Sequence, residues 1–274
     1  MRNLLSFDVE DWYQGLAIAP ARWGEFAPRL TIGMEVILDL LARHGTHATF
    51  FVLGVVAQDN PALVRQIVSA GHEIATHGWN HTPLYRQTPA DFRAELCASL
   101  AALRSMTDAP VVGHRAAFFS LTTATPWAPA ILAEAGIAYD SSIFPVHNYR
   151  YGVPAAPRFP YRLLPSLVEY PISTLRLGGL NVPFSGGFYA RFWPYAFLRW
   201  GIRMLNRQGQ PAIVYFHPWE FDPAHPHLRA EAAWLARRTH YHGLARSRRV
   251  LAALLRDFTW GPLGDATGPA GSPR

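Results

Sequence analysis

Residues 73–81 read Glu-Ile-Ala-Thr-His-Gly-Trp-Asn-His, a short strand-like run followed by two histidines four positions apart. The run predicts a strand that ends at Thr76, so that His77 and His81 lie in the turn after it. Side chains four residues apart on a helical turn, or on a loop bent like one, point the same way. Two neutral imidazoles held in this way can occupy neighbouring positions on a divalent metal ion. The pair alone is equally compatible with two polar loop residues.

Strand-like and helix-like segments alternate on both sides of this stretch. The expected strands are residues 4–8, 48–53, 73–76, 111–115, 139–141 and 212–217. The expected helices are residues 31–44, 61–70, 89–106, 125–135, 194–207 and about 229–257. Residues 144–194 break the pattern, because they are rich in Pro, Gly and aromatic residues and predict long loops with short hairpin pieces. Repeated strand–helix units are typical of a mostly parallel sheet with its functional groups at the carboxyl ends of the strands.

The charged residues limit the classes of function. The chain of 274 residues has a formal net charge of +6, and all 25 of its basic residues are arginine. The lack of lysine excludes Schiff-base chemistry and the P-loop lysine. The arginines are scattered and form no recognisable nucleic-acid module, so we expect no nucleic-acid partner. A basic surface is still compatible with peripheral contact with a membrane of anionic phospholipids.

The sequence favours a cytoplasmic location. Its single cysteine, Cys97, cannot form an internal disulfide, and we expect it to be buried in a helix. The first residues become acidic at Asp8, after too few apolar positions for a signal peptide. No apolar run approaches the ~18 residues of a membrane span. The inner face of the membrane remains an alternative location, and nothing in the sequence indicates the oligomeric state.

Polar residues follow the predicted strands where each strand ends. They are Asp8, Glu10 and Asp11, then His77 and His81, then Arg115, Asp140 and His217. Two histidines and one carboxylate leave a divalent ion with open positions for water and substrate, which is a hydrolytic arrangement. A second carboxylate can act as base and a further histidine as acid. An arginine beside the base would keep it ionised.

The order of these motifs resembles that of the NodB-homology polysaccharide deacetylases, carbohydrate esterase family 4. The matching segments are residues 6–12 (Ser-Phe-Asp-Val-Glu-Asp-Trp), the histidine pair, residues 113–118, residues 139–145 and residues 215–220. The resemblance is strongest to the branch associated with exopolysaccharide and exosortase loci. It covers about residues 4–217, and the remainder resembles the C-terminal extension of that branch. The resemblance therefore implies a distorted (β/α) barrel over residues 1–220, a helical extension over 221–260 and a disordered tail over 261–274.

The resemblance also assigns roles to individual residues. It implies Asp8 as catalytic base, His77 and His81 as metal ligands, Arg115 as the partner of the base, the backbone N–H of Phe118 as an oxyanion donor and His217 as general acid. Asp140 lies in a motif that, in relatives, orients the last histidine or shapes the pocket. Trp12 and Trp219 are candidates for stacking on a sugar face, although most aromatic residues here are expected in the core.

Two positions depart from the pattern of the family. Common members have adjacent aspartates, whereas Val9 follows Asp8 here. Strand side chains alternate, so Glu10 shares a face with Asp8 if the strand continues, and it is then the third metal ligand. If the chain turns at Val9, Asp11 would reach the metal instead. In addition, Ala117 replaces a usual proline, which would loosen the loop that carries Phe118.

We therefore expect an enzyme that removes N-acetyl groups from amino sugars of a bacterial exopolysaccharide or its precursor. Two imidazoles and a carboxylate favour Zn²⁺, although cobalt or nickel would also fit. One alternative is an amidohydrolase that acts on a small cyclic or formyl amide. Another is a relative that binds carbohydrate with little or no catalysis.

Overall fold

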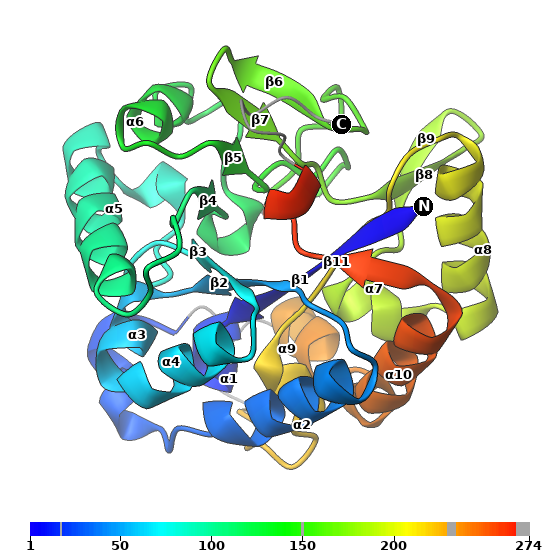
Figure 1. Ribbon diagram of the computed structural model, residues 1–274, viewed down its shortest axis with the longest axis horizontal. Helices are drawn as coiled ribbons and strands as arrows, with labels where there is room; N and C mark the ends of the chain where they lie inside the picture. Colours follow the sequence, from blue (N-terminus) through cyan, green and yellow to red (C-terminus); the bar gives the residue numbers. More distant parts are fainter. Residues whose placement is uncertain (17, 149–150, 229–233, 267–274) are drawn as a thin grey trace.

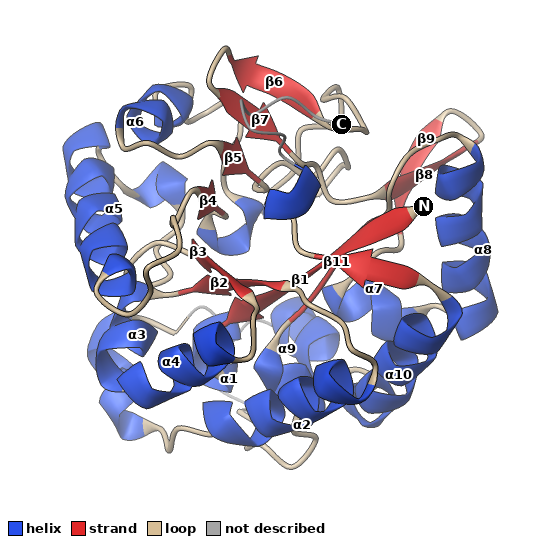
Figure 2. Ribbon diagram, in the orientation of Figure 1, coloured by secondary structure: helices blue, strands red, loops and turns tan. Residues whose placement is uncertain are grey.

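A curled, mostly parallel sheet forms the centre of the molecule (Figures 1 and 2). The computed structural model describes residues 1–16, 18–148, 151–228 and 234–266. The strand order is β10-β1-β2-β3-β4-β5-β7-β6, with β11 also paired to β1, and only β6 and β7 run antiparallel to each other. The strands are β1 (Arg2–Val9), β2 (Thr49–Val52), β3 (Glu73–Thr76), β4 (Gly113–His114), β5 (Tyr139–Asp140), β6 (Tyr161–Leu164), β7 (Leu167–Glu169), β10 (Ile213–Phe216) and β11 (Thr259–Gly261). The fold is the distorted (β/α) barrel that we expected.

Helices surround this sheet in the view of Figure 1. They are α1 (Trp12–Gly15), α2 (Leu30–Arg43), α3 (Gly54–Asp59), α4 (Pro61–Ser69), α5 (Pro89–Arg104), α6 (Ala128–Glu134), α7 (Gly187–Phe192), α8 (Tyr195–Arg207), α9 (Trp234–Tyr241) and α10 (Ser247–Asp257). Short 3₁₀ segments include η1 (Pro20–Glu25), η2 (Leu84–Arg86), η3 (Ala117–Phe119), η4 (Pro218–Phe221), η5 (Leu244–Arg246) and η6 (Gly264–Ala266). A separate hairpin joins β8 (Thr174–Leu177) to β9 (Leu180–Pro183). Within the described residues, no helix is long and apolar enough to cross a membrane.

The two faces of β1 determine what lies inside the barrel. Leu5 and Phe7 are fully buried and belong to the core that includes the apolar face of α2. Ser6 and Asp8 point to the opposite side, where both accept hydrogen bonds from Arg115. Because side chains alternate along a strand, the inner face of β1 carries polar groups to the carboxyl end of the sheet.

The C-terminal segment differs from the expected disordered tail. β11 pairs with β1, and Leu263 is fully buried. The backbone N–H of Leu263 donates to Oγ1 of Thr49, and that of Gly264 donates to Glu73. Residues 261–266 are therefore ordered, because these bonds and the burial of Leu263 fix them against the sheet. Residues 267–274, in the rest of the predicted tail, and residues 229–233 lie outside the described part of the chain. The division at residue 220 stays a prediction.

Two further local predictions are wrong. The described part of the helix expected over residues 229–257 is divided into α9 and α10, because Gly243 has a left-handed backbone (φ 64°) between them. Cys97 lies on the outer side of α5 and is exposed rather than buried.

Candidate active site

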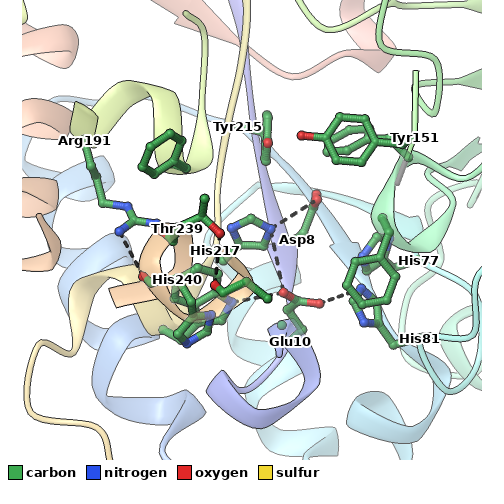
Figure 3. A pocket seen from close by; sticks show the side chains of 16 residues that line it. Asp8, Glu10, His77, His81, Tyr151, Arg191, Tyr215, His217, Thr239 and His240 are labelled. Carbon is green, nitrogen blue, oxygen red and sulfur yellow. Dashed lines mark hydrogen bonds and ion pairs between the residues drawn. The ribbon is translucent and has the colours of Figure 1, made fainter. Parts of the chain in front are cut away.

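A pocket of about 660 Å³ lies at the carboxyl ends of the strands. Its lining combines residues after β1, β3, β4 and β10 with residues of α7 and α9, as Figure 3 shows. The lining residues that we had expected in a site are Asp8, Glu10, His77, His81, Phe118, His217 and Trp219. The pocket therefore collects most of the predicted residues from segments far apart in the sequence.

Glu10, His77 and His81 form one compact cluster, with one potential ligand atom of each within 4.8 Å of the others. All three residues are buried. Nδ1 of His77 lies 2.8 Å from the carbonyl oxygen of Arg115, and Nδ1 of His81 lies 3.2 Å from that of Gln14. A carbonyl oxygen only accepts hydrogen bonds, so each Nδ1 carries the proton. In the neutral rings, each Nε2 then presents a lone pair.

The geometry at Glu10 fits a bound cation. Its Oε2 atom lies 2.7 Å from Nε2 of His81, yet this buried oxygen receives no hydrogen bond from any described residue. Two lone-pair atoms this close repel each other unless a positive charge lies beside both of them. Hydrogen bonds from Nδ1 to backbone carbonyls are the usual outer-shell support of metal-binding histidines. The cluster thus has the donor set and the orientation for a divalent transition metal.

The pKa values within the cluster are consistent with this charge pattern. Burial alone raises the pKa of Glu10. At low pH, where the imidazoles are protonated, the charge and hydrogen bond of His81 and the charges of His217 and His77 outweigh burial and hold that pKa below its usual range. Burial lowers the pKa of His77 to about 4. At neutral pH the carboxylate is therefore charged and the His77 ring is neutral, the forms in which both groups bind metal.

Asp8 lies at the pocket floor and is bound by Arg115. Nη1 of Arg115 donates to Oδ1 of Asp8 at 2.6 Å and to the Ser6 hydroxyl at 2.9 Å. The other guanidinium nitrogens donate to the carbonyl and hydroxyl of Ser141. The guanidinium also lies 4.1 Å from the ring centroid of Phe51. Because Arg115 is fully buried and fixed on all sides, Asp8 keeps one orientation and a paired charge.

Glu220 holds His217, the role that we had considered for Asp140. Both the backbone N–H of His217 and its Nδ1–H donate to Oε1 of Glu220, at 2.9 and 2.8 Å. Nε2 of His217 is directed into the pocket, 3.7 Å from Glu10 and 3.9 Å from Asp8 (Figure 3). Burial alone lowers the pKa of His217, but the bond to Glu220 and the three nearby carboxylates raise it above its usual value. His217 is therefore suited to donate a proton.

Arg191, on α7, completes this arrangement from the C-terminal half of the chain. Its Nε–H donates to Oε2 of Glu220 at 2.7 Å, and both side chains are fully buried. Its remaining N–H groups donate to the carbonyl oxygens of Thr239, His240 and His242, at and just beyond the end of α9. Arg191 thus links α7, α9 and the segment that carries the proposed acid.

The turn that carries Phe118 forms with alanine, rather than the usual proline of the family, at residue 117. Phe118 and Phe119 have φ values of 54° and 51°, a left-handed conformation that costs a non-glycine residue about 1–3 kcal/mol. The ring of Phe118 lies on His81 with a centroid distance of 4.3 Å. The surrounding contacts therefore impose this conformation without a proline at Ala117.

Asp140 supports that turn and is not among the residues that line the pocket, so a direct contact with substrate stays a prediction. It is fully buried and bound to Nδ1 of His114 at 2.6 Å and to the Ser142 hydroxyl at 2.7 Å. The Ser142 hydroxyl in turn accepts the backbone N–H of Ala116 at 2.7 Å. Burial and the Asp140 charge raise the pKa of the neighbouring Glu169 well above its usual value. A protonated Glu169 can share a hydrogen bond with Asp140 in this buried network.

Asp11 is not beside the histidine pair. Its carboxylate begins α1 and accepts the backbone N–H groups of Trp12, Arg29 and Leu30 at 2.8–3.1 Å. The strand β1 continues to Val9, so alternation directs Glu10 rather than Asp11 into the pocket. Both oxygens of the Asp11 carboxylate thus accept backbone hydrogen bonds away from the histidine pair.

Both tryptophans pack against other side chains of the protein, and a sugar-stacking role for either stays a prediction. Trp12 is 1% exposed and packs edge-on against Phe26. Trp219 lines the pocket, but His217 and His240 stack on its indole at 4.8 and 3.9 Å, nearly parallel to it. His217 and His240 therefore both occupy surface of the indole. Its Nε1–H donates to Oε1 of Glu10 at 3.0 Å, so Trp219 orients a candidate metal ligand.

The sequence analysis missed Glu220, Arg191 and His240. Glu220 had a visible signal, because a polar residue followed three positions later by Glu before a turn is the spacing of a capping box. Arg191 and His240 had none, since each lies in a segment whose position depends on long-range packing.

Two family models together cover most of the chain. Residues 31–139 match the model described as polysaccharide deacetylase, and residues 141–267 match a domain of unknown function, DUF3473. The histidine pair and Arg115 lie in the first match, whereas His217 and Glu220 lie in the second. Both matched regions therefore contribute to one pocket.

Curated and solved relatives agree with this match. A chitooligosaccharide deacetylase from Bradyrhizobium sp. (strain ANU 289) is 35% identical over 102 residues, which are 37% of this chain and 46% of that protein. The matched region thus spans less than half of that relative. A Mycobacterium smegmatis protein assigned as a polysaccharide deacetylase has a TM-score of 0.62 at 23% identity, over 96% of this chain and 87% of that one.

The fold is also found in a protein described as a pseudoenzyme. This member of carbohydrate esterase family 4, from Bacillus anthracis, has a TM-score of 0.50 at 14% identity, over 96% of this chain and 65% of that one. The fold alone therefore does not establish activity. Residues 31–139 nevertheless match the polysaccharide deacetylase family, and the chain has the fold of the solved structure from Mycobacterium smegmatis.

Proposed function

We propose that this protein is a metal-dependent deacetylase that hydrolyses the N-acetyl group of an amino sugar in a glycan. The observation that carries the proposal is the convergence of three groups of residues on one pocket. These are the Glu10–His77–His81 cluster, the Asp8–Arg115 pair and His217 with its proton on the side of Glu220. The curated relatives named as chitooligosaccharide deacetylases favour the same reaction.

Each group has a separate task in amide hydrolysis. Glu10, His77 and His81 would hold a divalent ion, which would supply Lewis acidity for the amide carbonyl and for a water molecule. Asp8, held in place by Arg115, accepts the proton of the attacking water. His217, with its raised pKa, gives a proton to the departing amine nitrogen. The backbone N–H of Phe118 is the proposed donor to the developing oxyanion.

The finer points of the proposal go beyond the comparisons. The donor set favours zinc among the divalent metals. The resemblance to the exopolysaccharide-associated branch favours an N-acetylated exopolysaccharide or its precursor as substrate. In this proposal, the acetamido group of the substrate enters the pocket of Figure 3 and lies beside Glu10 and His217.

Acetate release tests the proposal directly. Purified protein, stripped of metal and then supplied with Zn²⁺, is incubated with N-acetylglucosamine oligomers and with de-N-acetylated oligomers as a substrate blank. We expect acetate from the wild type, and a loss of about 10²–10⁴-fold in Asp8→Asn and in His217→Ala. Asp39→Asn, in an exposed ion pair on α2, is the matched control and should keep full activity.

Three results discriminate among the alternatives. Acetate release that depends on Asp8 and His217 supports the deacetylase. Turnover of small cyclic or formyl amides without acetate release would indicate an amidohydrolase instead. Tight binding of oligomers without turnover of any amide would indicate a binding protein.

A further inference from the structure

The exposed side of α8 carries a row of positive charges. Arg199, Arg203 and Arg207 are exposed and follow one another at intervals of four residues, and Trp200 is exposed three positions before Arg203. These spacings put the four side chains, which we call the α8 face, on one side of the helix. Asp257 lies 3.4 Å from Arg199, but within the described residues neither Arg203 nor Arg207 pairs with a carboxylate. Like charges at this spacing destabilise a helix, so an external anion would stabilise the row.

The segment around α8 lacks acidic residues that could neutralise this row. No Asp or Glu occurs between Glu169 and Glu220, and both of these are fully buried. Arg176, on the hairpin of β8 and β9, adds a further exposed positive charge. Figure 1 shows the hairpin beside α8, and a Cβ at Gly201 of α8 would lie only 3.0 Å from a methyl carbon of Leu175 on β8. The helix and the hairpin therefore form one surface with a local excess of positive charge.

Aromatic side chains are exposed beside these charges. Trp200 is 41% exposed and Phe192, at the end of α7, is 46% exposed. Ring contacts through Trp193 and Phe197 connect the two, with centroid distances of 5.0, 4.6 and 5.6 Å. Phe192 also stacks on Phe188, which lines the pocket of the proposed active site. The aromatic surface is thus continuous from the edge of the pocket to α8, unlike the isolated apolar residues found on most protein surfaces.

The tip of the hairpin exposes two leucines as well. Leu177 and Leu180, which we call the hairpin tip, are 38% and 66% exposed and pair across the turn. Gly178 and Gly179 between them have φ values of 53° and 83°, as a tight two-residue turn requires. The turn therefore presents the two leucines together at the exposed end of the hairpin.

We propose that the α8 face and the hairpin tip dock on a membrane surface of anionic phospholipids. Arginines attract the negative headgroups, tryptophan is favoured at the boundary between headgroups and acyl chains, and leucines enter the apolar layer. A soluble polyanion would bind the arginines but leave the leucines in water. A second copy of this chain would place arginines opposite arginines in a symmetric contact. The proposal is independent of the reaction in the pocket.

Vesicle binding tests the charge of the α8 face. The full chain is sedimented with vesicles of phosphatidylcholine alone and with vesicles of equal parts phosphatidylcholine and phosphatidylglycerol, at low and high NaCl. We expect binding to the anionic vesicles, lost at high salt because salt screens the charges. Arg203→Gln combined with Arg207→Gln should weaken this binding about thirtyfold, which corresponds to about 2 kcal/mol for the loss of two arginines.

Matched variants separate this surface from the net charge of the protein. Arg65→Gln combined with Arg104→Gln removes two exposed arginines from α4 and α5, at the opposite end of the view in Figure 1, and should keep wild-type binding. Leu180→Ser tests the apolar contact and should weaken binding to anionic vesicles about fivefold. Ile32→Ser, which changes an exposed apolar residue of α2, is its control and should have no effect.

Four results would overturn the proposal. They are no binding of the wild type to anionic vesicles, equal weakening by the two double variants, equally tight binding of a DNA duplex that Leu180→Ser leaves unchanged, and dimerisation of the wild type that Leu180→Ser abolishes. The third would indicate a general polyanion surface, and the fourth a contact between copies of this chain. Circular dichroism melts establish that each variant is folded. If the α8 double variant does not fold, the salt dependence and Leu180→Ser decide.

Discussion

Replacing Arg191 by methionine tests whether the C-terminal half of the chain holds the proposed acid in place. The substitution keeps the unbranched apolar stem of the side chain but leaves Glu220 charged and buried without its guanidinium partner. It also removes the donors to three backbone carbonyls around the end of α9. Breaking a fully buried ion pair costs about 3–5 kcal/mol. At ~2–4 °C per kcal/mol, the melting temperature should fall by roughly 10 °C.

A double-mutant cycle separates stability from catalysis. Glu220→Gln in the Arg191→Met background removes the unpaired charge, so the double variant should recover much of the lost stability. It should not recover activity, because Glu220→Gln takes away the carboxylate that holds His217. The matched control is Arg93→Met, which breaks the exposed Arg93–Glu134 pair and should cost less than about 1 kcal/mol.

The assays are urea denaturation followed by circular dichroism, and acetate release at a temperature where every variant is folded. A loss for Arg191→Met no larger than that for Arg93→Met would show that the buried pair does not stabilise the site. Recovery of full activity in the double variant would refute the claim that Glu220 acts on His217.

Three other changes follow from the site and its support. Glu220→Gln removes the carboxylate that raises the pKa of His217. Because the acid works only when it is protonated, the alkaline limb of the pH profile of kcat/KM should move to lower pH. An alkaline limb at the wild-type pH in an active variant would contradict this role of Glu220. His81→Ala should reduce bound Zn²⁺ from about one equivalent to a small fraction after dialysis, measured by atomic emission, and unchanged zinc content would place the metal elsewhere. Gly33→Ala puts a Cβ 1.9 Å from a backbone oxygen of η4, whereas the Cβ of the control Gly24→Ala meets no atom. Thermal melts should show that Gly33→Ala lowers the free energy of unfolding by at least about 2 kcal/mol, and that Gly24→Ala does not. Equal melting temperatures of the two variants would refute the contact.

Much of the barrel could be predicted because its signals are local. The expected strand at residues 73–76 matches β3, and the expected helix start at Thr88 is a capping box with Asp91. The alternation of side chains along a strand also favours Glu10 over Asp11 from the sequence alone. These features depend on spacing within a few residues, which a single sequence displays.

The remainder depends on contacts between distant segments. Arg191 lies in the stretch where the strand–helix pattern lapses, and it meets Glu220 only after α7 packs beside α9. Tryptophan is a residue type that often stacks on sugars, but in the folded chain the rings of His217 and His240 stack on Trp219. Burial and pairing of this kind are properties of the packed fold, so the residue types alone could not reveal them.

The acceptors that fix the two imidazoles of the metal cluster are both main-chain oxygens, of Arg115 and Gln14. No amino-acid substitution deletes a carbonyl group. The path of the backbone therefore determines which nitrogen of His77 and of His81 carries the proton. A mutation of a neighbouring side chain does not remove either acceptor. A descendant that lost Asp8 or His217 would stop turning over substrate yet keep both Nε2 atoms aimed at the same point. In such a lineage, metal capture would outlast catalysis.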